Sequence, residues 1–269
     1  MQIRANCKVN VGLRVRRKRD DGYHEIETLF YPVYGLYDLI DIEKDEREGQ
    51  HITLTTSGIG VDCAADDNLI VRAYLRMAAM YTGVGSVRVH LEKRVPFGAG
   101  LGGGSSDATH VVKAINELFA LGLTREQMAE AVRPIGADCA FFLYNTPCMA
   151  TGIGEKIRPV DFSWASKRMV MIKPPVSVST KEAYAGIRLH DEPLDIQVND
   201  FEETVFARYP ILGRVKQALM NAGAEYAAMS GSGSVVYGVF EKDTERGSLP
   251  LNRLIDEDLA AMVIFDDTL

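Results

Sequence analysis

The sequence has few cysteines, and none of them lies in a pairing pattern. Four cysteines occur in 269 residues, at positions 7, 63, 139 and 148, without a C-x-x-C pair. A disulfide framework or a cysteine-based zinc site is therefore not expected in a chain of this length. We expect reduced, partly buried thiols, as in a cytoplasmic protein.

Long apolar runs and excess positive charge are also absent. The longest apolar stretch, residues 135–153, is interrupted by Asp138 and Pro147, whereas a membrane-spanning helix needs about 20 mostly apolar residues. No apolar segment follows Arg4 and Lys8, so no signal peptide is expected. The formal net charge is −7, which argues against a general nucleic-acid binder. We expect a cytoplasmic protein without membrane or nucleic-acid partners.

The chain does contain an ordered series of strand and helix patterns. The predicted strands comprise residues 3–15, 26–34, 51–56, 86–91, 168–173 and 235–240, and the predicted helices comprise residues 70–80, 108–119, 124–133, 181–187 and 211–222. These elements do not alternate as βαβ units, so the order indicates an α+β protein. A new block begins after Gly154, which predicts two domains, residues 1–155 and 156–269.

A glycine-rich segment lies between a predicted strand and a predicted helix. Five of the seven residues from Gly98 to Gly104 are glycine, and Ser105 and Ser106 follow. Glycines let backbone N–H groups approach a ligand closely, and a helix N-terminus carries partial positive charge. We expect the two serines to cap the helix. The segment therefore predicts a phosphate site, with a flexible surface loop as the alternative.

Three familiar nucleotide-binding motifs fit this segment poorly. The spacing Gly98-x-Gly100-x-x-Gly103 matches the dinucleotide fingerprint, but no βαβ unit surrounds it. A Walker A loop needs a lysine where Gly104 stands. The protein-kinase motifs H-R-D and D-F-G are missing from the sequence. These three classes are therefore disfavoured.

The segment from Pro96 to Ser106 resembles the central motif of the GHMP small-molecule kinases. Residues 6–10 resemble the N-terminal motif of these kinases, and residues 228–234 resemble their C-terminal glycine motif. The resemblance implies an α+β, two-domain GHMP kinase fold with its active site in the inter-domain cleft. It also implies ATP as co-substrate with Mg²⁺, although no dedicated carboxylate metal site is visible.

Further segments resemble one family of these kinases, the 4-diphosphocytidyl-2-C-methyl-D-erythritol kinases. Gly22-Tyr23-His24 separates that family from its mevalonate-pathway relatives, and residues 67–73 and 135–142 agree with it. The resemblance implies ATP-dependent phosphorylation of the substrate 2-hydroxyl in the non-mevalonate route to isoprenoid precursors. The alternatives are another GHMP kinase, of the homoserine or mevalonate type, or a non-catalytic nucleotide-binding protein.

The resemblance assigns catalysis to Lys8 and Asp138. Asp138 would accept the proton of the attacking hydroxyl and contact the substrate. Lys8 would keep Asp138 ionised and stabilise charge on the transferred phosphoryl group. From the residues alone, Asp138 could equally be a turn aspartate, and an exposed strand lysine is the more common role for a lone lysine such as Lys8. Asn10, on the same strand face as Lys8, is implied as a further substrate contact.

The resemblance also assigns the binding residues. Tyr23 would stack on the cytosine and His24 would hydrogen-bond its edge. Tyr184 would supply the second aromatic face, with helix packing as its alternative role. The residues implied to bind ATP are Asn68, Lys93, Pro96, Gly98, Gly100, Leu101, Gly102, Gly103, Gly104, Ser105 and Ser106. Ser105 or Ser106 would also contact Mg²⁺.

The basic run at residues 14–19 invites a nucleic-acid interpretation. Asp20 and Asp21 follow it directly, so a solvated hairpin tip is the better expectation. A role in attracting the substrate diphosphate stays open. For the assembly we expect a monomer or a weak homodimer.

Overall fold

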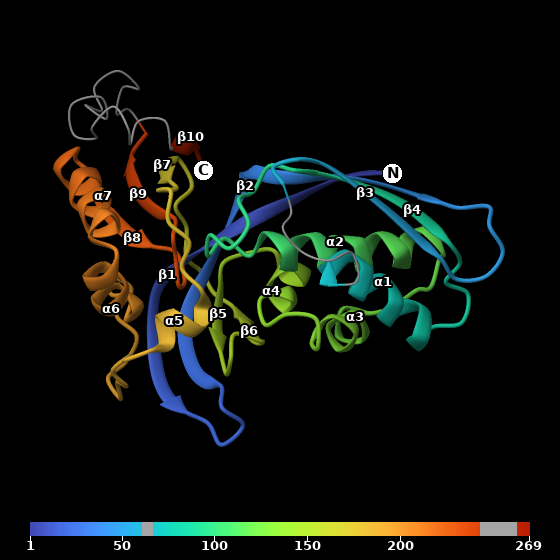
Figure 1. The fold of residues 1–269 in the computed structure, drawn as a ribbon, viewed down its shortest axis with the longest axis horizontal. Helices are drawn as coiled ribbons and strands as arrows, with labels where there is room; N and C mark the ends of the chain where they lie inside the picture. The colour runs from blue at the N-terminus through green and yellow to red at the C-terminus, as the bar shows by residue number, and fades with distance from the viewer. Residues whose placement is uncertain (61–66, 243–262) are drawn as a thin grey trace.

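The computed structural model describes residues 1–60, 67–242 and 263–269, and it divides into two halves around a long ribbon of two strands (Figure 1). β1 (Gln2–Lys18) and β2 (His24–Lys44) form this ribbon as an antiparallel pair. The turn signal at Asp20-Asp21-Gly22 falls between them, as predicted. The ribbon therefore runs along both halves of the molecule.

The first sheet is completed by four shorter strands. β4 (Val87–Lys93) pairs with the C-terminal part of β2, and β3 (Ile52–Gly58) adds to β4 in parallel. β5 (Cys148–Thr151) pairs with the N-terminal part of β2 and then with β6 (Lys156–Pro159). The long β2 thus carries β4 and β5 at different points of its length.

Four helices pack on one face of this sheet (Figure 1). They are α1 (Leu69–Met80), α2 (Gly103–Leu118), α3 (Arg125–Val132) and α4 (Cys139–Tyr144). Their apolar faces share one core with alternate residues of β2 and β4. Because successive side chains of a strand point to opposite faces of the sheet, the residues between them face away from the helices. Thr124 forms the predicted capping box with Gln127 at the start of α3.

The second sheet has the order β10-β7-β9-β8. Its strands are β7 (Lys167–Ile172), β8 (Tyr226–Met229), β9 (Val236–Glu241) and β10 (Val263–Thr268), all paired antiparallel. β10 belongs to the segment after Phe240 that was expected to complete the second half.

Three helices belong to the second half, and their apolar residues share a core with its sheet. These helices are α5 (Thr180–Tyr184), α6 (Phe201–Arg208) and α7 (Pro210–Asn221). The ribbon joins this core too, because Leu13 packs in it. The Leu13 N–H donates to the Val198 carbonyl at 2.8 Å. The domain boundary near residue 155 stays a prediction, since β6 still pairs within the first sheet.

Some sequence expectations need correction. α2 begins at Gly103, before Ser105 and Ser106, which were expected to cap it, and α5 ends at Tyr184 instead of continuing to residue 187. The helices α4 and α6 and the strands β5, β6, β8 and β10 were not predicted. Cys7, Cys139 and Cys148 are buried and unpaired, in agreement with expectation, and Cys63 lies outside the described residues.

Candidate active site

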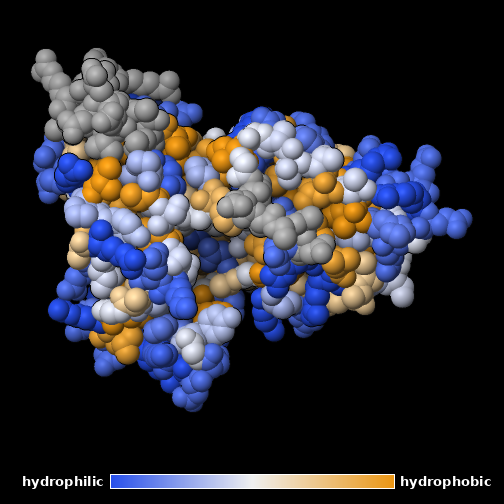
Figure 2. Space-filling view, in the orientation of Figure 1, coloured by the Kyte–Doolittle hydropathy of each residue, from blue (hydrophilic) through white to orange (hydrophobic). Residues whose placement is uncertain are grey.

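A hollow of about 330 Å³, here called the central hollow, lies between the two halves, where the surface in Figure 2 is indented. Parts of all three kinase-like motifs line it: Lys8 and Asn10 from β1, the glycine-rich segment, and the glycine turn between β8 and β9. The other lining residues are Leu13, Ile26, Phe30, Ala137, Asp138, Ile153, Val178, Thr180, Tyr184 and Phe201. The fold therefore gathers segments from most of the chain around one space.

The glycine-rich segment needs its glycines for two different reasons. Gly100 has φ +78°, and an added Cβ would overlap the backbone carbonyl oxygen of Ser230. Gly102 has φ +69° and forms the N-cap of α2 without any side-chain hydrogen bond. The expectation that Ser105 and Ser106 cap this helix was wrong, because the left-handed glycine starts the helix before them.

The N-terminus of α2 opens into the central hollow. Gly102 and Ser105 line the hollow, and the first N–H groups of a helix have no partner within it. Ser106 is fully buried, and its hydroxyl donates to the Asn6 carbonyl at 2.6 Å. Of the two serines, Ser105 is therefore the one that lines the central hollow.

Lys8 is buried beside this helix end, and its ammonium has three acceptors. Its Nζ lies 2.7 Å from Asn10 Oδ1, 3.0 Å from the Gly100 carbonyl oxygen and 3.2 Å from Asp138 Oδ2. A lysine ammonium has three N–H donors, so the three contacts fix its position. The side chain of Asp138 keeps 28% of its surface exposed, next to the hollow. The pair thus joins a held cation to an accessible carboxylate.

Asn10 orients Lys8 from the same face of β1. Its Oδ1 accepts from Lys8, and its Nδ2 donates to the hydroxyl of Thr28 at 3.1 Å. Asn10 is only 3% exposed but lines the central hollow. The structure shows its contact with Lys8. Its contact with a substrate stays a prediction.

A second hollow of about 290 Å³, here called the hairpin hollow, adjoins the central one. Tyr23, His24 and Lys181 line it, and it shares Ala137, Ile153, Thr180 and Tyr184 with the central hollow. Tyr23 is 60% exposed, which leaves its ring open to a ligand. The predicted cytosine residues and the predicted catalytic pair therefore line two adjoining spaces.

His24 and Tyr184 contact each other in this structure. Their rings are stacked, with centroids 4.4 Å apart and planes 11° apart, and Phe201 packs edge-on against Tyr184. Burial and the charge of Asp138 raise the pKa of Tyr184 to about 12, so its phenol is neutral. Burial and nearby Lys18 lower the pKa of His24, so its imidazole is neutral at pH 7. A base stacked on Tyr184 would need His24 to turn aside, unless it uses Tyr23 alone.

A third hollow of about 180 Å³ lies beside α1 and α2, and it is lined by the apolar side chains of Leu69, Leu91 and Phe97. Asn68 and Lys93, both implied to contact ATP, also line it, as do Asp67, Gly104 and Asp107. Asn68 caps α1, with its Oδ1 accepting from the Ile70 N–H at 2.9 Å. The size and apolar walls of this hollow suit a flat ring such as a nucleotide base.

The sequence analysis did not identify Asp38 and Asp107, two buried carboxylates beside Lys93. The ammonium of Lys93 bonds to Asp38 and, at 2.9 Å, to Asp107. Asp38 also accepts the N–H groups of Arg94 and Val95, which lead into the glycine-rich segment. Burial raises the pKa of Asp107 to about 8. Lys93, Asp38 and Asp107 together hold the start of the glycine-rich segment in place. The sequence signal that could have revealed this cluster is Asp38, a carboxylate in an otherwise apolar strand.

The remaining predicted nucleotide residues are placed as follows. Leu101 is buried in the core, and its carbonyl accepts the Lys8 N–H at 3.0 Å. Pro96 lines none of the three hollows named so far, while Gly98 lines the central one. Gly103 lies against Lys93, whose Nζ is 3.0 Å from the position of an added Cβ. Their contacts with ATP stay predictions.

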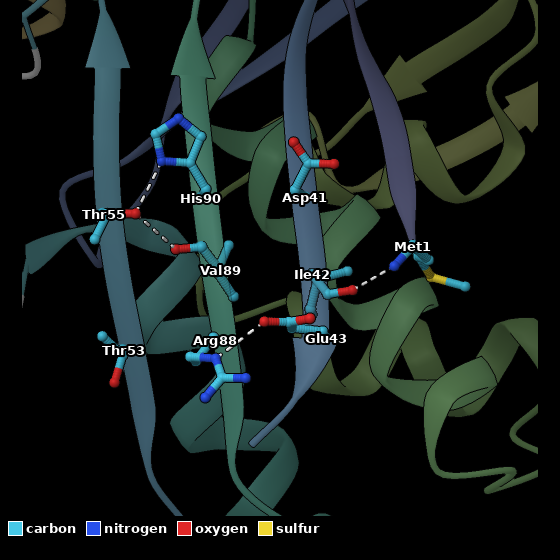
Figure 3. A pocket seen from close by; sticks show the side chains of 9 residues that line it. All are labelled: Met1, Asp41, Ile42, Glu43, Thr53, Thr55, Arg88, Val89 and His90. Atoms are coloured by element: carbon cyan, nitrogen blue, oxygen red, sulfur yellow. Dashed lines mark hydrogen bonds and ion pairs between the residues drawn. The ribbon is translucent and has the colours of Figure 1, made fainter. Parts of the chain in front are cut away.

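Another hollow, of about 350 Å³, lies on the outer face of the first sheet (Figure 3). It is lined by Met1, Asp41, Ile42, Glu43, Thr53, Thr55, Arg88, Val89 and His90. Arg88 bonds to Glu43 at 3.0 Å and His90 to Thr55 at 2.8 Å. These side chains largely satisfy one another, and Asp41, Glu43, Arg88 and His90 point away from the helix-covered face.

The basic run is largely neutralised by carboxylates. Arg17 pairs with Glu25 at 2.8 Å and Arg19 with Asp21 at 2.7 Å, at the exposed hairpin tip. Arg14 is buried and pairs with Asp200, so the run begins in the interior and only its later part is solvated.

Within the described part of the chain, no three His, Cys, Asp or Glu side chains gather closely enough to hold a metal ion. None of the helices in residues 1–60, 67–242 and 263–269 is long and apolar enough to cross a membrane.

Comparison with known proteins then decides the family. Residues 68–146 match the model of the GHMP kinases N-terminal domain, and residues 186–249 match that of the GHMP kinases C-terminal domain. A 4-diphosphocytidyl-2-C-methyl-D-erythritol kinase of Bacteroides thetaiotaomicron is 41% identical over 91% of this chain and 93% of its own. The chain belongs to this family of GHMP kinases. It is an ATP-dependent small-molecule kinase, as predicted.

Further relatives agree with that assignment. The Parabacteroides distasonis protein of the same name is 43% identical over 89% of this chain and 91% of its own. A crystal structure of 4-(cytidine 5'-diphospho)-2C-methyl-D-erythritol kinase covers 94% of this chain and 95% of its own, with a TM-score of 0.76 and 32% identity. Homoserine kinase from Cytophaga hutchinsonii has a TM-score of 0.75 at 19% identity over 100% of this chain and 94% of its own, which supports the shared fold alone. The predicted two-domain α+β kinase fold is confirmed.

Proposed function

We propose that this kinase transfers the γ-phosphoryl group of ATP to the 2-hydroxyl of 4-diphosphocytidyl-2-C-methyl-D-erythritol, giving the 2-phosphate and ADP. The observation that carries the proposal is the adjoining pair of hollows: Lys8 and Asp138 line one, and Tyr23 and His24 line the other. One elongated ligand with a base at one end and an alcohol at the other fits this arrangement. The relatives named above support the same substrate.

Asp138 is proposed as the group that accepts the hydroxyl proton. Its carboxylate forms an ion pair with Lys8, whose Nζ lies 3.2 Å from Asp138 Oδ2. The same ammonium stabilises negative charge as the phosphoryl group moves from ATP to the alcohol. Because Asn10 and Gly100 also hold Lys8, the cation keeps its position throughout the transfer.

The glycine-rich segment and the N-terminus of α2 are proposed to bind the ATP phosphates. Backbone N–H groups and the helix dipole favour anions at this end of the central hollow. The hollow beside α1 and α2 then takes the adenine, near Asn68 and Phe97. This arrangement points the γ-phosphate toward Lys8 and Asp138.

Mg²⁺ is proposed to arrive with ATP. Its hard oxygen ligands would come chiefly from the phosphates and water, with Ser105 as the hydroxyl placed beside them. When bound, the ion neutralises phosphate charge. The lone carboxylate of Asp138 beside the hollow fits an ion held mostly by its nucleotide.

The protein is proposed to act as a monomer or a weak homodimer in the cytoplasm, where ATP is available. The residues of the three hollows between and beside the halves all come from one chain, so catalysis needs no second copy. Pairing of Arg16, Arg17 and Arg19 with carboxylates argues against nucleic acid as a partner of the hairpin.

The test is ATP turnover, measured by ADP release with the cytidyl substrate, homoserine and mevalonate in parallel. We expect turnover with the cytidyl substrate alone. Turnover with homoserine or mevalonate alone would keep the kinase and refute the substrate. No turnover with any alcohol, despite ATP binding, would favour a non-catalytic nucleotide-binding protein.

A further inference from the structure

A substrate that spans the central hollow and the hairpin hollow must place its diphosphate between them. This inference rests on the proposed function. The base lies in the hairpin hollow and the reacting hydroxyl in the central hollow, while the two phosphates link them. Four residues line both hollows and so mark the passage: Ala137, Ile153, Thr180 and Tyr184. None of these four side chains carries a positive charge at pH 7.

Among the described residues, two basic side chains line these hollows, Lys8 and Lys181. Lys8 already contacts Asn10, Gly100 and Asp138 with its three donors. Lys181 follows Thr180 directly and lines the hairpin hollow. Lys181 is exposed, and within the described part of the chain its ammonium has neither a hydrogen bond nor an ion pair.

The start of α5 holds Lys181 at this place. Ser179 and Glu182 form a capping box, with both hydrogen bonds at 3.1 Å. Arg208 pairs with Glu182 at 2.9 Å, so this neighbouring cation is neutralised while Lys181 is not. The local geometry thus fixes the backbone of Lys181 but leaves its charge available.

Two arginines of the basic run, which line neither of these hollows, are neutralised by carboxylates. Arg17 and Arg19 of the basic run pair with Glu25 and Asp21. The positive charge of the basic run, which could have attracted the diphosphate, is therefore largely neutralised by carboxylates of the same hairpin. A diphosphate carries at least two negative charges, and a lysine ammonium binds such oxygens as a point charge.

We propose that Lys181 binds the bridging diphosphate of the substrate and so selects a nucleoside-diphosphate-linked alcohol over a plain alcohol or a nucleoside. Lys181 acts on binding and takes no part in the proton transfer at Asp138. Its loss therefore weakens ground-state binding and leaves the chemical step nearly unchanged.

The test compares CDP with cytidine by titration calorimetry, with a non-hydrolysable ATP analogue filling the nucleotide site. In Lys181→Met, which keeps the apolar stem, we expect CDP to bind about tenfold more weakly and cytidine to bind as before. Lys181→Arg restores the charge and should recover most of the difference. In turnover, Lys181→Met should raise KM for the cytidyl substrate with kcat kept.

Lys18→Met is the matched control. Lys18 is an exposed lysine whose charge acts on His24, but it does not line the hairpin hollow. An equal loss of CDP affinity in Lys18→Met would refute direct contact and indicate a general field. An unchanged CDP-to-cytidine ratio in Lys181→Met would overturn the inference and leave the proposed function intact. A wild-type protein that binds neither ligand would overturn both.

Discussion

The two ends of the proposed active site are built differently. At the catalytic end, Lys8 and Asn10 are each 3% exposed and joined by a hydrogen bond of 2.7 Å. At the cytidyl end, Tyr23 is 60% exposed and Lys181 has no partner among the described residues. Chemistry requires reacting groups held in place, whereas recognition of a large ligand leaves donors and rings free until it arrives.

The difference also concerns which segments build each end. The catalytic end is held by backbone, since Gly100 touches Ser230 and its carbonyl accepts from Lys8. The cytidyl end depends on side chains from the hairpin and from α5. Substitutions at the first end should therefore affect turnover with any substrate, and those at the second end should affect substrate choice.

The largest expected effect comes from a substitution at the catalytic end. In Asp138→Asn, kcat should fall by about 10²–10⁴-fold because the acceptor of the hydroxyl proton is lost. Affinity for ATP should stay close to wild type, as measured by calorimetry. Asp161→Asn, at an exposed position, is the control. A kinase that keeps its kcat in Asp138→Asn would contradict the assignment.

The next effect tests whether backbone contact shapes the catalytic end. Gly100→Ala places a Cβ against the Ser230 carbonyl, whereas Gly98→Ala has open space, and both glycines have positive φ. Strain from φ alone costs about 1–2 kcal/mol, so Gly98→Ala should show that much destabilisation. Gly100→Ala should add about 1–3 kcal/mol of overpacking and lower kcat/KM for ATP. Chemical unfolding and ATP kinetics measure both; equal effects would refute the contact.

A smaller effect is expected at the cytidyl end. Tyr23→Ala should raise KM for the cytidyl substrate about 10–100-fold, since stacking on an aromatic ring contributes about 1–3 kcal/mol per base. KM for ATP should not change, and Tyr23→Phe should behave as wild type because the ring face remains. Equal losses toward both substrates would show that Tyr23 supports the fold and not the base.

The smallest effect concerns stability in the helix that begins at the glycine segment. Burial and nearby Lys113 lower the pKa of His110 to about 4, below its unfolded value of 6.5. The folded state therefore resists protonation, so stability is lost as pH falls from 6.5 toward 4. Between pH 7 and pH 5 the loss from this group should be about 2 kcal/mol.

Urea unfolding at these two pH values checks the loss. The variant His110→Gln should lose less stability than the wild type over the same interval. An identical pH dependence in the two proteins would show that other groups control acid unfolding.

The sequence predicted the elements whose patterns are local. The strand and helix periods and the Thr124 capping box are examples. The apolar run of α4 was not resolved, because a short run of six apolar residues, four of them buried, suits a strand as well as a helix. The start of α2 was placed late, since glycine and serine have weak helix propensity and hid its first turn.

Contacts between distant residues could not be predicted from spacing. Lys93 meets Asp38, 55 residues away, and His24 stacks on Tyr184 from another half of the molecule. The resemblance brought Lys8 and Asp138 together, and the structure shows the ion pair. The strand spacing put Asn10 on the same face as Lys8, but it did not indicate that the two side chains would be hydrogen-bonded.

The most direct test of a single substrate spanning both hollows is a crystal structure with the cytidyl substrate and a non-hydrolysable ATP analogue. We expect the cytosine beside Tyr23 and His24 and the 2-hydroxyl within hydrogen-bonding distance of Asp138. A cytosine bound elsewhere, or a 2-hydroxyl turned away from Asp138 while the γ-phosphate lies in the central hollow, would contradict the account.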